Sequence, residues 1–132
     1  MTPLPVWLRR ALLTTAAMNL LVGLAFASGS EAILEAAGFP HPVDAFYALT
    51  VGLLVALFGV GYGCAAVARR TERMFVTLAG FGKLAFVTLV VSLWVAGRLP
   101  TRAPIAASPD LIFGMLFLGW TFASREAPSQ DN

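Results

Sequence analysis

The fold of this chain is decided by a stretch that reads MFVTLAGFGKLAFVTLVVSLWVA over residues 74–96. Its one charged side chain is Lys83, and every other residue in it is apolar or small. At about 1.5 Å of rise per residue, a helix of this length crosses the ~30 Å hydrocarbon core of a bilayer. We therefore expect residues 74–96 to form a membrane-spanning helix.

Three further apolar stretches of similar length cover residues 11–28, 45–67 and 104–123. Of the 132 residues, 58% are hydrophobic and 12% charged, which leaves too few polar side chains to cover a soluble domain. We expect an all-α membrane protein, a bundle of four transmembrane helices that forms a single domain over residues 1–127. The polar tail over residues 128–132 has nothing to bury and is expected to be disordered.

The composition excludes several kinds of chemistry. Because Cys64 is the only cysteine and His41 the only histidine, a disulfide within the chain, a CxxC redox pair, bis-histidine haem ligation and HExxH zinc chemistry are all impossible. We expect no metal, cofactor or catalytic residue, and an enzyme is disfavoured. Nucleic acid is not an expected partner, because the basic residues gather at helix ends and not on one face.

The distribution of charge predicts the orientation of the chain. One side of the predicted spans carries six basic residues, which are Arg9, Arg10, Arg69, Arg70, Arg73 and Arg125. The other side carries Arg98 and Arg102 together with acidic residues. The positive-inside rule then places both termini in the cytoplasm of a bacterial inner membrane. A cleavable signal peptide over the first stretch is the alternative, and the length of that stretch and Asn19 in its middle disfavour it.

The loop between the first two spans has the signals of a short interfacial helix. Ser30 is a suitable N-cap for a helix over residues 31–37, and Gly38 followed by Pro40 ends it. Asp44 is a suitable N-cap for the second span. We expect a lid over this end of the bundle, and an ordinary loop is the alternative.

The second span carries small residues at steps of four, three and four, so they share one face: Gly52, Ala56, Gly59 and Gly63. Small residues let membrane helices approach closely. We expect this face to pack against another helix of the chain, and a homodimer contact is the alternative.

Four polar side chains, one from each span, are predicted at similar depths: Asn19, Tyr62, Lys83 and Asp110. We expect them to converge near the middle of the membrane as a ligand-binding site. Ser108 and Pro109 read as the N-cap and first residue of a helix that starts within the fourth span, so that span is expected to be kinked or broken. Lys83 and Asp110 form either a structural ion pair or a functional one.

The chain has four short spans, an Asp in the last of them, and the run Gly80, Phe81, Gly82, Lys83 and Leu84. With these features it resembles small bacterial inner-membrane proteins of the DoxX-like group. In that group the Gly and Lys-Leu signature lies in or just after the first helix, whereas here it lies in the third. The resemblance implies an accessory subunit of a membrane redox system, or a protein that handles small lipophilic molecules.

Three functions are therefore compared. The one we favour is binding or transport of a small lipophilic molecule, an anionic one included, in a midplane pocket. The second is a structural or accessory subunit of a larger membrane complex. The third is an intramembrane isomerase that uses Asp110 and Lys83 as acid and base.

Overall fold

The computed structural model describes residues 1–40 and 44–124, and its described residues are mostly helical. In chain order the elements are β1 (Thr2–Pro3), α1 (Val6–Ser28), α2 (Glu31–Ala37), α3 (Ala45–Ala68), β2 (Arg70–Thr71), α4 (Arg73–Val95) and α5 (Arg102–Ala123). Four of these helices, α1, α3, α4 and α5, are long and apolar enough to cross a membrane. The predicted all-α fold with four long apolar helices is confirmed, and it suggests a multi-pass membrane protein. Arg125 and the predicted disordered tail lie outside the described residues.

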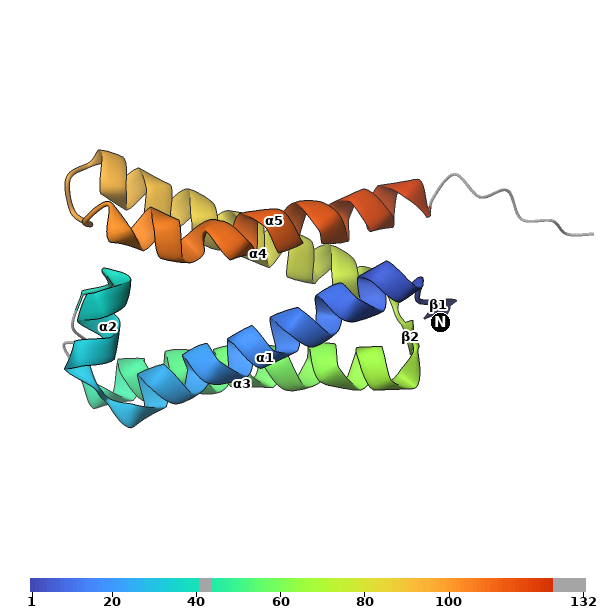
Figure 1. The fold of residues 1–132 in the computed structure, drawn as a ribbon, viewed down its shortest axis with the longest axis horizontal. Coiled ribbons are helices and arrows are strands. Elements are labelled where there is room, and N and C mark those ends of the chain that lie inside the picture. Colours follow the sequence, from blue (N-terminus) through green and yellow to red (C-terminus); the bar gives the residue numbers. More distant parts are fainter. Residues whose placement is uncertain (41–43, 125–132) are drawn as a thin grey trace, which may run out of the picture.

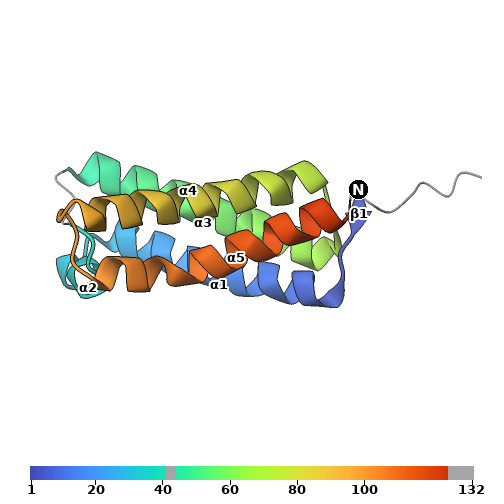
Figure 2. The same cartoon turned by 90° about the horizontal axis from the view of Figure 1, so that it is seen from above.

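The four long helices are arranged in two layers of two (Figure 1). Helix α1 packs along α3, and α4 packs along α5, whereas contacts between the layers are few. The layers meet at the end of the molecule that carries the N-terminus and the end of α5, and at the opposite end the short helix α2 lies between them (Figures 1 and 2). The fold is thus two helix pairs joined at one end and bridged at the other.

Helix α1 begins at Val6, five residues before its predicted start, and so contains Arg9. Its Nε donates a hydrogen bond to the Ala66 carbonyl near the end of α3, at 3.0 Å. Similarly, Arg73 Nη2 donates to the Thr121 carbonyl at the end of α5, at 2.7 Å. The last carbonyls of a helix lack partners within it, and these arginines supply them where water is scarce. Of the basic residues predicted to flank the spans, Arg9, Arg10, Arg73 and Arg102 thus lie within helices, whereas Arg69, Arg70 and Arg98 lie outside them.

The same end of the molecule is fastened by a two-residue antiparallel pairing of β1 with β2, in which Thr2 faces Thr71. The Leu4 amide also donates to the Arg69 carbonyl, at 3.0 Å. Where the layers meet, the core is apolar and partly aromatic and contains Leu8, Leu12, Tyr62, Val76, Ala79, Phe117 and Trp120. The N-terminal segment is thereby tied to the connection between α3 and α4.

The small-residue face of α3 lies against α1. A Cβ added to Gly52 would stand 2.8 Å from the Gly23 carbonyl oxygen, and one added to Gly59 would stand 3.1 Å from that of Ala16. A Cβ added to Gly23 would stand 2.9 Å from the Ala56 Cβ, while one added to Gly63 would meet nothing nearer than 3.9 Å. Because α1 covers this face, its closest helix contact is made within the chain.

Helix α2 has the bounds predicted for the interfacial helix. Gly38 follows it with a φ of 80°, and a Cβ there would stand 2.8 Å from the Ala103 amide nitrogen. Ser30 occupies the N-cap position but makes no side-chain capping bond, whereas Asp44 accepts a hydrogen bond from the Phe46 amide at 2.7 Å. His41 and Pro42 lie outside the described residues. Helix α2 thus follows α1 in the chain and packs against the start of α5.

The fourth span is not broken, and on this point the sequence prediction is wrong. Helix α5 runs from Arg102 to Ala123 with Pro109 inside it. Proline lacks the amide that would bond to the carbonyl four residues earlier, which belongs to Ile105. The Ser108 hydroxyl donates to that carbonyl instead, at 2.7 Å. Ser108 therefore replaces the missing bond and does not cap a new helix; the kink remains a prediction.

Candidate functional site: an ion pair between the paired helices

The candidate site is an ion pair formed by Lys83 of α4 and Asp110 of α5, whose Oδ1 contacts the lysine Nζ. Lys83 lies about 18 Å along α4 from Val95, and Asp110 about 12 Å along α5 from Arg102. These two helix ends are joined by a short loop, so the stem of the lysine, ~6 Å long, spans the difference in depth. The lysine side chain is 7% exposed and the aspartate side chain 24%.

Tyr62 of α3 forms the second wall of the site. The Lys83 Nζ lies 5.8 Å from the centroid of its ring, where the electron-rich face of the ring attracts a cation. The same ring packs against Phe75 at 5.7 Å and Phe117 at 5.9 Å between centroids. An aromatic cluster from α3, α4 and α5 thus holds Tyr62 in place beside the ammonium group.

The ion pair leaves hydrogen-bonding capacity unused. A lysine ammonium has three N–H donors and a carboxylate two acceptor oxygens. Among the described residues, the pair itself is the one hydrogen bond that either Lys83 or Asp110 makes through its side chain, and the Tyr62 hydroxyl makes none. The site can therefore both donate to and accept from a further polar group.

Thr15 is a buried polar residue that the sequence analysis did not single out. It is fully buried, and its Oγ1 has no hydrogen-bond partner among the described residues. Four other threonines in the helices donate to the carbonyl four residues earlier: Thr14, Thr77, Thr88 and Thr121. Thr15 does not, although an apolar position would favour that bond. The signal in the sequence was its spacing from Leu8 and Leu12, which places it on the buried face of α1.

The depth of Thr15 follows from its neighbour. Ala16 contacts α3 at both Gly59 and Gly63, the residues that bracket Tyr62. Thr15 therefore lies at the level of Tyr62, on the helix opposite.

Asn19 of α1 has no hydrogen bond to the ion pair. Its Cβ lies in the contact between α1 and α3, where it would stand 3.1 Å from a Cβ added to Gly59. It makes no hydrogen bond with a described residue. Of the four residues predicted to converge, the structure brings together Lys83, Asp110 and Tyr62.

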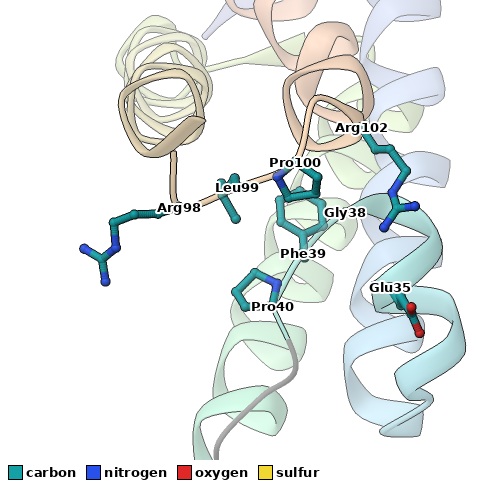
Figure 3. Close-up of a pocket in the computed structure, with 8 residues that line it drawn as sticks. All are labelled: Glu35, Gly38, Phe39, Pro40, Arg98, Leu99, Pro100 and Arg102. Atoms are coloured by element: carbon teal, nitrogen blue, oxygen red, sulfur yellow. The ribbon is translucent and has the colours of Figure 1, made fainter. Parts of the chain in front are cut away.

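Two cavities lie at the ends of the molecule, and neither is lined by Lys83 or Asp110. The smaller, of about 110 Å³, lies between α2 and the loop before α5, and its lining residues are Glu35, Gly38, Phe39, Pro40, Arg98, Leu99, Pro100 and Arg102 (Figure 3). In that view the Arg98 side chain points away from the hollow and the Arg102 side chain lies toward Glu35. The larger, of about 310 Å³, lies at the opposite end beside α3 and the start of α4.

Within residues 1–40 and 44–124, no three His, Cys, Asp or Glu side chains gather as a metal site. The chain matches no known protein family, and no curated protein and no solved structure is significantly similar to it.

Proposed function

We propose that this chain is a bacterial inner-membrane protein, with both termini in the cytoplasm, that binds the polar end of a small lipophilic molecule at the Lys83–Asp110 pair. The observation that carries the proposal is the ion pair, which lies deep within two apolar helices and has hydrogen-bonding groups to spare. The proposed orientation rests on the exposed arginines Arg10, Arg69 and Arg70 at the end that carries the N-terminus.

Energetics support a functional pair over a structural one. A lysine in the middle of a membrane helix costs about 2.5 to 3.5 kcal/mol on the insertion scale. A buried ion pair repays little of such a cost, since apolar residues of the same volume are often equally or more stabilising. The four helices already have close glycine contacts to pack them. A role in binding accounts for a pair that the fold does not need.

The charge of the pair indicates the kind of molecule. Because Asp110 compensates the Lys83 ammonium, the site has no net charge and gives an anionic group no advantage. A group that both donates and accepts a hydrogen bond, such as a hydroxyl, matches the spare N–H groups of Lys83 and the second oxygen of Asp110. We therefore propose an uncharged lipophilic alcohol or phenol as the ligand class, in place of an anionic lipophile.

The arrangement of the helices supports entry from the lipid. The backbones of α3 and α4 remain apart over most of their length, and only a few side chains, such as Tyr62 and Phe75, join them near one end. An apolar tail needs no water-filled path to enter from the lipid. The tail would lie between the layers while its head group reaches Lys83.

The test is photo-labelling of the full chain in lipid nanodiscs with a long-chain alcohol that carries a diazirine near its hydroxyl. We expect labelling of peptides from α3, α4 and α5 near residues 62, 83 and 110, and its loss in the double variant Lys83→Met with Asp110→Leu. The matched control is Thr88→Val, which removes an exposed hydroxyl from α4 and should label as the wild type does.

Three results would count against the proposal. Preferential labelling by a carboxylate of the same chain length would restore the anionic ligand. Equal labelling of the double variant would remove the site. Scattered labelling by every probe, together with capture of a protein neighbour by the wild type alone, would favour the accessory-subunit function.

A further inference from the structure

Helix α3 has a second face of small residues, opposite the one that contacts α1. Its members follow at steps of three, one and three: Gly61, Cys64, Ala65 and Ala68. At about 100° per residue, this face lies on the far side of the helix from Gly52, Ala56, Gly59 and Gly63. Large residues, Leu54 and Leu57, continue the stripe further along the helix. The small face is therefore confined to the half of α3 nearest the N-terminal end of the molecule.

This face forms the floor of the larger cavity, of about 310 Å³. The ring of Phe75, near the start of α4, makes the opposite wall, and a Cβ added to Gly61 would stand 3.1 Å from its Cζ. Above the apolar part, the cavity is lined by Met1, Arg70, Thr71 and Glu72. The hollow is thus apolar along the helix and charged at the end where the helix leaves the membrane.

The charge at the mouth of the cavity is positive. Arg70 forms no hydrogen bond or ion pair through its side chain with any residue of the described ranges, 1–40 and 44–124. Glu72, the acidic residue of the lining, lies 3.7 Å from the Met1 amino group and is compensated by it. Exposed Arg69 lies beside Arg70 and adds to the positive potential.

The dimensions of the cavity suit one hydrocarbon chain. From Gly61 to Ala68 the helix rises about 10.5 Å, most of the depth of one leaflet of a ~30 Å hydrocarbon core. The volume is at the lower end of the range of about 300 to 1,000 Å³ typical of small-molecule sites. Exposed Cys64 and Ala68 leave the cavity open along its side, so a lipid enters it without leaving the bilayer.

We propose that this cavity is a binding site for an anionic phospholipid of the adjacent leaflet. One acyl chain lies along Cys64, Ala65 and Ala68 beside the Phe75 ring, and the phosphate of the headgroup pairs with the Arg70 guanidinium. Arginine suits this role because its fork of N–H groups matches phosphate oxygens. The site is separate from the Lys83–Asp110 pair, and its occupancy does not depend on the ligand proposed there.

The experiment uses the full chain in nanodiscs of equal parts phosphatidylglycerol and phosphatidylcholine, with a trace of either lipid carrying a diazirine in its acyl chain. We expect the phosphatidylglycerol probe to label peptides within residues 61–75, and unlabelled phosphatidylglycerol to compete better than phosphatidylcholine. Arg70→Gln should lower that labelling about fivefold, because it removes the guanidinium that lines the cavity and pairs with the phosphate. Arg69→Gln, which removes a neighbouring charge outside the cavity, should retain most of it.

Filling the cavity gives an independent test. Gly61→Leu should abolish labelling by both probes within residues 61–75, whereas Gly82→Leu, where an added Cβ meets nothing within 4 Å, should leave it unchanged. Should Gly61→Leu fail to fold by circular dichroism, Ala68→Leu fills the same cavity from an exposed position. Equal labelling by both lipids that Arg70→Gln does not alter, or labelling that the filled cavity retains, would overturn the proposal.

Discussion

Separating the two members of the ion pair should cost more than removing both. Lys83→Met leaves the Asp110 carboxylate without its cation, and Asp110→Leu leaves the ammonium of Lys83 without its anion. Removing one partner of a buried pair costs about 3 to 5 kcal/mol. We expect both single variants to lose about this much, because lipid around the proposed midplane site cannot solvate the stranded charge.

The double variant should regain most of the lost stability. Apolar replacements of a buried pair range from neutral to stabilising by about 1 to 4 kcal/mol. We therefore expect the free energy of unfolding of the double variant to lie within about 1 kcal/mol of the wild-type value or to exceed it. The two single costs, together at least about 6 kcal/mol, should then fail to add by about 5 kcal/mol or more. Reversible unfolding by dodecyl sulfate in mixed micelles, followed by circular dichroism, measures all four proteins, with Thr88→Val as the control for α4.

One outcome would refute this reasoning. If the double variant loses as much stability as the two single variants together, the two residues are not coupled and each stabilises the fold on its own. The fold would then need both residues, against the proposal.

Three further predictions concern the fold. Gly52→Leu should destabilise the protein by about 1 to 3 kcal/mol or more, because the new side chain forces α1 and α3 apart. Val60→Leu, on the exposed side of α3, should change the melting temperature little, and equal melting temperatures of the two variants would count against the close contact. Ser108→Ala should cost about 1 to 3 kcal/mol by leaving the Ile105 carbonyl without a partner, and an unchanged unfolding midpoint would show that the bond is not needed. A reporter fused after Asn132 should be active in the cytoplasm and one inserted at Gly38 in the periplasm, and the reverse pattern would overturn the proposed orientation.

The long helices and the ion pair were predictable from the sequence because both depend on large energies. Apolar length alone defines the four spans, and a charged residue within a span needs a partner of opposite sign. Lys83 and Asp110 are the two charged residues inside the predicted spans, so each is the natural partner of the other.

The remaining sequence predictions depend on smaller effects. Depth arithmetic placed Asn19 at the level of Lys83, and its part in a ligand site stays a prediction; its Cβ lies against Gly59 of α3. The rule that proline starts a helix predicted a break at Pro109, because the rule does not include the hydroxyl of Ser108 as a substitute donor. The spacing of Thr15 indicates its burial on α1, but it does not reveal the missing hydrogen bond, since a threonine among alanines and leucines is ordinarily bonded to its own helix.

The most direct test of the proposed site uses the fact that Lys83 is the only lysine in the chain, so protein labelled with ¹⁵N at the lysine Nζ gives one ammonium signal. Solid-state NMR of that protein in lipid bilayers should show the signal of a paired, buried ammonium, and a long-chain alcohol should shift it in a saturable way. In Thr88→Val the shift should be retained, and in Asp110→Leu it should be lost. A signal that a long-chain alcohol leaves unchanged at every concentration, or that a long-chain carboxylate shifts instead, would contradict the proposal that the Lys83–Asp110 pair binds an uncharged polar head group.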